Sequence, residues 1–214
     1  MYIIDEGQRS GFPILLLHGL GANAESWYLQ IPVLAEAGYR VIAPDLPGFG
    51  KSTFEGSDWS FDWVSKELFK MMCSYHIQKF GLLGISMGGV IGLKMASEYS
   101  EFVSMSILVN TFAVLRPQGW SELRYFLQRG LRAFFLSPDA QAELVAQRVF
   151  PGNEKMIYRI MLAESIKQAD QRVYRRAMLA LARFDGRKLA SKITNPVLVV
   201  SGERDTTVPL YLQR

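Results

Sequence analysis

Short apolar runs recur along the chain, and longer segments with helical periodicity separate them. The runs are continuous and do not alternate with polar residues, which is typical of strands that a sheet buries on both faces. They lie at residues 2–4, 13–17, 40–43, 80–85, 104–109 and 196–200. Because strands alternate with helical segments as far as residue 111, the pattern predicts an α/β fold with a doubly wound, mostly parallel sheet.

Two of the intervening segments carry clear helix signals. Apolar residues from Phe61 to Tyr75 fall on one face at helical spacing, and Asp58 or Ser60 precedes them as an N-cap candidate. A second helix is predicted over residues 88–99, directly after Ser86. Both helices are expected to cover the sheet.

Residues 112–190 break the alternation and are predicted to be helical throughout. Ser137 and Pro138 have the sequence of an N-cap followed by a first helical proline, Asp170 is a further N-cap candidate, and Gly186 would end the last helix. We therefore expect a core formed by residues 1–111 and 191–214, with a helical cap inserted at 112–190.

The composition limits the class of protein. With 214 residues, 49% of them hydrophobic and 21% charged, the chain can bury a core. A single cysteine excludes a disulfide framework, and no Cys/His spacing predicts a metal site. The start of the chain lacks the pattern of a secretory signal, and no apolar run reaches the roughly 20 residues that span a bilayer. We expect a cytoplasmic protein without a membrane partner.

The net charge of +4 is unevenly distributed. Residues 116–192 contain 15 basic and 7 acidic residues, a net of +8, so the rest of the chain carries −4. The basic residues follow helical spacing and do not cluster, which argues against a nucleic-acid partner. An anionic substrate held by Arg116, Arg124 or Arg129 is one explanation, but solvated faces of amphipathic helices fit the spacing better.

The segment Gly84-Ile85-Ser86-Met87-Gly88 matches G-x-S-x-G between a predicted strand and a predicted helix. Such a turn projects the serine hydroxyl above the sheet, and the backbone N–H of the next residue, Met87, can stabilise a developing oxyanion. A glycine-rich turn between a strand and a helix that has no catalytic role could have the same five-residue sequence.

Two further motifs follow the ends of predicted strands. His18-Gly19-Leu20-Gly21 follows the run at 13–17, where the Leu20 N–H can supply a second oxyanion donor. Asp205 follows the run at 196–200, in the position of a catalytic acid.

These motifs, with the Pro- and Gly-rich turn at residues 43–52, resemble the α/β-hydrolase fold superfamily in its lid-bearing esterase and enol-lactonase-like branch. The resemblance extends from about residue 2 to residue 209. It implies Ser86 as the nucleophile, Asp205 as the triad acid, and Leu20 and Met87 as the oxyanion hole. It also implies a pocket beneath the cap and no metal or organic cofactor. Residues expected to contact the substrate are His18, Gly19 and Trp120.

The family orders its triad as Ser, then Asp, then His. No histidine follows Asp205, so we expect the chain to stop before its catalytic base and final strand. His18 is expected to shape the oxyanion loop, and His76 precedes the strand that ends at Ser86, which places it at the opposite edge of the sheet.

The predicted reaction is hydrolysis of a carboxylic ester or lactone through an acyl-enzyme. A serine nucleophile argues against the haloalkane dehalogenase and epoxide hydrolase branches, which attack with Asp. Hydrolysis of a C–C bond on the same fold remains an alternative, as does a non-catalytic binding protein or an inactive fragment. If the strand at 196–200 ends the sheet, its bare edge favours a homodimer.

Two nucleotide-binding patterns are weak. Residues 19–24 match G-x-G-x-x-A, but Asp45 lies 26 residues after Gly19 within turn chemistry, so we expect it to stabilise a turn. Residues 50–52 resemble the end of a phosphate-binding loop whose first glycine position is occupied by Asp45.

Overall fold

The computed structural model describes residues 1–117, 119–205 and 207–213. Within this part, the side chains of residues 121, 122, 125, 126, 129 and 133 lie outside the description. No helix of the described chain is both long and apolar enough to cross a membrane.

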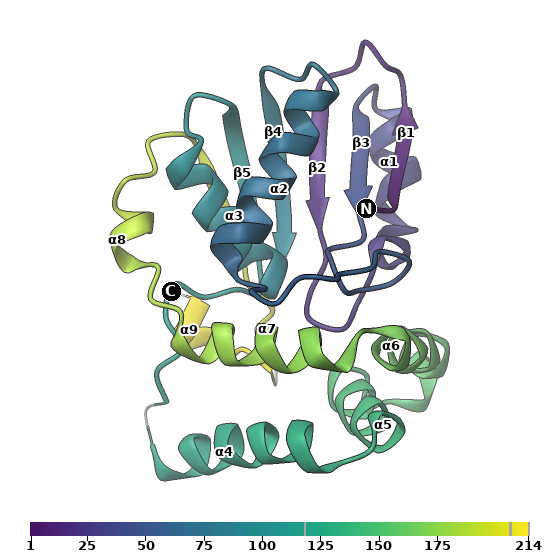
Figure 1. The fold of residues 1–214 in the computed structure, drawn as a ribbon, viewed down its shortest axis with the longest axis vertical. Coiled ribbons are helices and arrows are strands. Elements are labelled where there is room, and N and C mark those ends of the chain that lie inside the picture. Colours follow the sequence, from purple (N-terminus) through teal and green to yellow (C-terminus); the bar gives the residue numbers. More distant parts are fainter. Residues whose placement is uncertain (118, 206, 214) are drawn as a thin grey trace.

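A six-stranded sheet forms the centre of the described chain, in the order β1-β3-β2-β4-β5-β6 (Figure 1). Its strands are β1 (Ile3–Gly7), β2 (Pro13–Leu17), β3 (Arg40–Pro44), β4 (Phe80–Ile85), β5 (Val103–Val109) and β6 (Val197–Val200). β1 is antiparallel to β3, and all other neighbouring strands are parallel. The predicted α/β fold with a mostly parallel sheet is therefore confirmed, and the antiparallel first strand adds to it.

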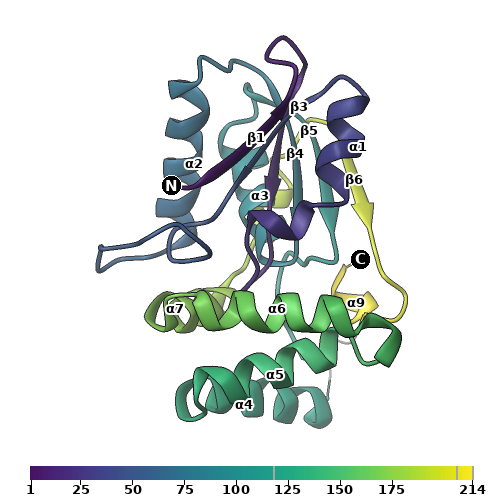
Figure 2. The same ribbon diagram turned by 90° about the vertical axis from the view of Figure 1, so that its right-hand side faces the viewer.

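Helices cover both faces of the sheet (Figure 2). Helix α1 (Gln30–Glu36) lies on one face, and α2 (Phe61–Ser74) and α3 (Met87–Glu98) lie on the other. The larger core packs Leu15 and Leu82 of the sheet with residues of α2 and α3. A smaller core packs Leu16 and Val41 with Ile31 of α1. Consecutive strand residues thus enter different cores, which explains why the apolar runs are continuous.

Helices α4 (Trp120–Phe135), α5 (Pro138–Val149), α6 (Met156–Gln168) and α7 (Gln171–Arg183) form a second layer, which we call the helical layer. It lies across the carboxyl ends of the parallel strands (Figure 1). Its contact with the sheet domain includes a hydrogen bond from the Asp170 N–H to the Gly48 carbonyl at 2.8 Å. Asp170 also caps α7, and Ser137 caps α5, as the sequence predicts.

The remaining described helices are short. They are η1 (Ala24–Trp27), η2 (Asn153–Lys155), α8 (Arg187–Ala190) and α9 (Leu210–Gln213). In Figure 1, α9 lies close to the helical layer, beside the end of the chain.

Strand β6 forms one edge of the described sheet and is open to solvent. Its four residues are all apolar and are between 39% and 56% exposed. Met105 on the neighbouring strand β5 is 47% exposed, so the uncovered apolar surface continues onto the face of the sheet. Natural sheet edges are usually very short, charged or covered, and β6, although short, has no charged residue.

The N-cap of α2 provides a test of the local structure. The Ser60 side chain accepts a hydrogen bond from the Trp63 N–H at 3.2 Å, so Ser60 and not Asp58 is the cap. We expect Ser60→Ala to lower the free energy of unfolding by about 1 kcal/mol in urea titrations, because a helical N–H loses its partner. Ser57→Ala, at an exposed position before the helix, should leave it unchanged. Equal effects of the two substitutions would contradict this role.

Candidate active site

Ser86 lies in the turn between β4 and α3, in a strained backbone conformation. Its φ of 53° and ψ of −114° place it in a region that non-glycine residues rarely adopt. The Ser86 N–H donates to the Val109 carbonyl at 2.9 Å, and the Thr111 hydroxyl donates to the Ser86 carbonyl at 2.8 Å. The end of β5 and the residues after it therefore fix the turn.

The two glycines of the motif allow very close backbone packing around this turn. A Cβ placed on Gly84 would lie 2.3 Å from the Gly88 carbonyl oxygen, and one on Gly88 would lie 2.1 Å from that of Leu17. Any side chain at these positions would push α3 away from β2 and β4. The spacing of the G-x-S-x-G motif thus reflects a steric requirement on both sides of Ser86.

The loop after β2 lies beside Ser86. A Cβ placed on Gly19 would be 3.6 Å from the Ser86 Cβ, so the HG segment and the serine are neighbours. Leu20 follows in this loop and is half-buried, while Met87 is fully buried as the first residue of α3. The structure therefore brings together Ser86, Gly19 and the two segments that contain the predicted oxyanion donors.

His18 is fully buried, and both its ring nitrogens are engaged by the backbone. Nε2 accepts a hydrogen bond from the Leu46 N–H at 2.9 Å, so Nδ1 carries the proton and donates to the Gly19 carbonyl at 2.8 Å. Burial lowers the pKa of His18 to about 4, although the Gly19 carbonyl and the Asp45 charge oppose this shift. His18 joins the loop after β2 to the turn after β3, and the expected direct contact with substrate is not available to it.

Asp45 stabilises the same region, as the sequence predicts. Its carboxylate is buried and accepts hydrogen bonds from the Ala24 N–H at 2.7 Å and the Lys51 N–H at 2.6 Å. A Cβ on Gly50 would collide with this carboxylate. Both oxygens of Asp45 therefore serve the turn, which leaves none free for a nucleotide ribose.

Asp205 lies in the loop after β6, where an Asx-type turn holds its carboxylate. Oδ1 accepts from the Thr207 N–H and hydroxyl, both at 2.7 Å, and from the Val208 N–H at 3.0 Å. The Gly202 N–H in the same loop donates to Oδ1 of Asn110 at 2.6 Å. Asn110, at the end of β5, thus ties the Asp205 loop to the strand next to Ser86.

Trp120 and His76 are both exposed to solvent. Trp120 is 87% exposed at the start of α4, and its contact with a substrate stays a prediction. His76 is exposed and precedes β4, whereas Ser86 follows it, which places the two at opposite edges of the sheet.

Arg116, Arg124 and Arg129 are the arginines for which an anionic substrate is the less favoured explanation. Arg116 and Arg124 have exposed side chains, and that of Arg129 lies outside the described residues. The same part of the chain contains no group of three or more His, Cys, Asp or Glu side chains that could hold a metal ion.

The sequence analysis missed Tyr174 of α7. Tyr174 is fully buried, and a Cβ on Gly21 would lie 3.0 Å from its ring, so it packs against the loop that contains Leu20. Nothing near Tyr174 in the sequence signals this contact, because its partner lies at the other end of the chain.

The buried neutral His18 predicts a specific dependence of stability on pH. Because the pKa of His18 in the folded protein, about 4, is below its ordinary value of 6.5, the unfolded chain binds a proton that the folded one does not. The stability is therefore full above pH 6.5 and falls by about 3 kcal/mol as the pH is lowered to 4, at about 1.4 kcal/mol per pKa unit.

Urea titrations of wild type and His18→Asn between pH 4 and 7.5 measure this effect. We expect the variant to be less stable at pH 7.5 and to lack this part of the pH dependence. His76→Asn, at an exposed position, should keep the wild-type slope. An unchanged slope in His18→Asn would show that His18 is not held neutral.

Comparisons with known proteins agree with the observed fold. The enol-lactonase from Burkholderia xenovorans LB400 has a TM-score of 0.89 at 23% identity, covering 100% of this chain and 82% of that one. A thermophilic esterase from Thermogutta terrifontis has a TM-score of 0.82 at 26% identity, covering 99% of this chain and 78% of that one.

Curated relatives include the 2-hydroxy-6-oxo-6-(2'-aminophenyl)hexa-2,4-dienoic acid hydrolase of Metapseudomonas resinovorans. It is 29% identical over 212 residues, which are 94% of this chain and 70% of that protein. Two further relatives are a putative non-heme chloroperoxidase of Synechocystis sp., 37% identical, and a haloalkane dehalogenase of Mycobacterium marinum, 36% identical. Each aligns over only 38% of its own length. The family model described as alpha/beta hydrolase fold matches residues 13–214. The chain therefore belongs to the α/β-hydrolase fold family.

Proposed function

We propose that the chain carries the nucleophile and oxyanion site of a serine hydrolase that acts on carboxylic esters or lactones. The observation that carries this proposal is the strained Ser86, with φ of 53°, at a turn between a buried strand and a helix. Strain of 1–3 kcal/mol persists where the surroundings fix it and function requires it. A relative solved structure described as an esterase supports the ester class.

The proposed reaction proceeds through an acyl-enzyme. The Ser86 oxygen attacks the substrate carbonyl carbon, and the carbonyl oxygen takes the negative charge. The Leu20 and Met87 N–H groups stabilise this oxyanion. The alcohol leaves with a proton, and water then releases the acid and restores Ser86.

The base for this reaction is not found among residues 1–214. The chain contains two histidines, of which His18 is buried with both nitrogens bonded and His76 lies at the opposite edge of the sheet. Asp205 is the group that would orient a histidine, since its loop is tied to β5 through Asn110. Without a base, the remaining acceleration comes from the oxyanion site and binding, roughly 10³–10⁴-fold over water.

Hydrolysis of a C–C bond is the second candidate. The relative from Metapseudomonas resinovorans is named for a substrate with a keto group and a carboxylic acid but no ester. Hydrolysis of such a compound can break a C–C bond beside the ketone, and the same serine and oxyanion site suit attack on that carbonyl.

We also propose that the exposed β6 edge pairs with a second copy of the chain. Its apolar residues are 39–56% exposed, and an unpaired strand presents free N–H and C=O groups to a partner strand. Light scattering after gel filtration should show a dimer that Leu198→Lys converts to a monomer. A monomeric wild-type chain would contradict the pairing.

A fluorophosphonate probe tests the catalytic proposal directly, because it forms a covalent bond with an activated serine. We expect labelling of the folded chain at Ser86, identified by peptide mass spectrometry, at a slow rate because the base is lacking. Ser86→Ala should abolish labelling, whereas Ser57→Ala, at an exposed position, should not change it. A chain that is folded by circular dichroism but unlabelled would favour a non-catalytic binding protein.

A further inference from the structure

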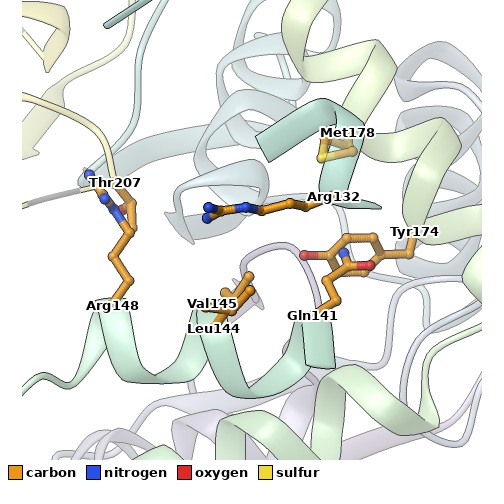
Figure 3. A pocket seen from close by; sticks show the side chains of 8 residues that line it. All are labelled: Arg132, Gln141, Leu144, Val145, Arg148, Tyr174, Met178 and Thr207. Carbon is orange, nitrogen blue, oxygen red and sulfur yellow. The ribbon is translucent and has the colours of Figure 1, made fainter. Parts of the chain in front are cut away.

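Helix α4 forms the outer side of the helical layer. It contacts α5 and α7, and α7 lies between it and the sheet (Figure 1), as Figure 2 also shows. Arg132 of α4 lines a pocket together with Gln141 of α5 and Tyr174 of α7, so this side of the helix turns toward its neighbours (Figure 3). The half-buried Leu123 and Gln128 border the same inner side. The opposite side of α4 faces outward.

The outward side of α4 carries large apolar side chains that are open to solvent. Four of them lie on one face of the helix, at spacings of seven, four and three residues: Trp120, Leu127, Leu131 and Phe134. They are 87%, 58%, 58% and 45% exposed, and Phe135 beside them is 82% exposed. We call these five residues the apolar stripe. It follows the whole helix, about 24 Å at 1.5 Å per residue. Single exposed apolar residues are normal on a protein surface, whereas a contiguous set marks an interaction site.

Basic residues flank the apolar stripe. By sequence, α4 carries three arginines and one acidic residue, and α7 carries four arginines and no acidic residue. Helix α5 adds two acidic residues and one arginine, and residues 116–192 together keep a net charge of +8. Arg124 is exposed one helical turn after Trp120, and the Arg175 guanidinium lies 5.8 Å from the centre of the Phe134 ring. An apolar face bordered by arginines is typical of helices that lie on anionic membranes.

The same charges disfavour a second copy of the chain as the partner of the stripe. In an antiparallel pair of α4 helices, Arg124 of each copy would lie near Arg132 of the other, and in a parallel pair the two Arg124 side chains would meet. Like charges at such contacts are destabilising. A lipid surface has no such repulsion, because its phosphates and carboxylates attract arginines. Trp120 also has the amphipathic ring that is enriched where headgroups meet acyl chains.

We propose that α4 docks the protein on the surface of an anionic phospholipid bilayer. Trp120, Leu127 and Leu131 enter the boundary between headgroups and acyl chains, and Arg124 pairs with lipid phosphates. The helix lies parallel to the membrane plane, so docking needs no membrane-spanning helix, and none is found in the described chain. The proposal replaces the expectation of no membrane partner, which considered spanning segments alone, and it does not depend on the proposed reaction.

Sedimentation with vesicles tests this inference on the full chain. Vesicles of phosphatidylcholine with about 30% phosphatidylserine are compared with vesicles of phosphatidylcholine alone at pH 7.5. We expect binding to the anionic vesicles to be about tenfold tighter and to weaken as the salt concentration rises, because salt screens the arginines. No binding to either kind of vesicle, or equal binding to both, would overturn the inference.

Tryptophan fluorescence reports whether the stripe itself enters the bilayer. Of the four tryptophans, Trp27 and Trp59 are buried, Trp63 is half-buried and Trp120 is exposed. We expect the emission maximum to move to shorter wavelength when anionic vesicles are added, because Trp120 leaves water. Trp120→Phe should keep most of the binding and lose this shift. A full shift in Trp120→Phe would contradict the insertion of α4.

Substitutions at exposed positions assign the binding to α4, with the fold checked by circular dichroism. Leu127→Ser and Leu131→Ser should each weaken binding to anionic vesicles about tenfold, because less apolar area leaves water. Arg124→Gln should weaken it about fivefold and leave binding to neutral vesicles unchanged. Val33→Ser, at a 64% exposed position of α1, is the matched control and should change neither. Equal losses in Val33→Ser and Leu127→Ser would show that α4 is not the docking surface.

Light scattering after gel filtration distinguishes a bilayer from a second copy of the chain. A dimer that Leu127→Ser converts to a monomer would show that two copies cover the stripe, and it would reject membrane docking. The same oligomeric state in wild type and Leu127→Ser, together with weaker vesicle binding by the variant, would support it.

Discussion

The close approach of α3 to β2 and β4 is the constraint on which the candidate site depends. Backbone atoms meet there without a side chain between them, since a Cβ on Gly88 would lie 2.1 Å from the Leu17 carbonyl oxygen. This contact forces the chain to turn sharply at Ser86 and to accept a strained φ. The strain, of order 1–3 kcal/mol, is offset by the larger core that packs α2 and α3 against the sheet. The close packing of α3 on the sheet and the half-buried serine at the end of β4 are thus consequences of the same contact.

Hydrogen bonds to the backbone fix the buried polar groups beneath the site. His18 and Asp45 are buried, and each bonds to backbone groups of two different loops. Neither is placed to react with a substrate. Their effect is to hold the loop after β2 against Ser86, so that the segment with Leu20 keeps its position without a covalent link. A histidine held neutral by burial is suited to this role because its ring accepts a hydrogen bond from the Leu46 N–H at Nε2 while Nδ1 donates to the Gly19 carbonyl.

The parts of the structure that the sequence predicts are those set by local pattern. The continuous run at Pro13–Leu17 marks a buried strand, and Ser60 and Asp170 mark helix starts, because strand burial and caps depend on neighbouring residues. The 87% exposure of Trp120 could not be predicted, because the direction of a side chain on α4 depends on how that helix docks. Tyr174 escapes prediction for the same reason, since its position depends on Gly21.

The difference in charge between the helical layer and the rest of the chain is a property of the surface. Segment 116–192 carries +8 and the rest carries −4, and most of those basic residues are solvated on helix surfaces. Arg132 and Arg148 are exposed as well, although they line a pocket beside Thr207. The contact between the helical layer and the sheet domain includes uncharged groups, such as the Asp170 N–H that donates to the Gly48 carbonyl and the Val173 side chain that lies against Gly48. The helices can therefore carry a positive charge without burying it against the core.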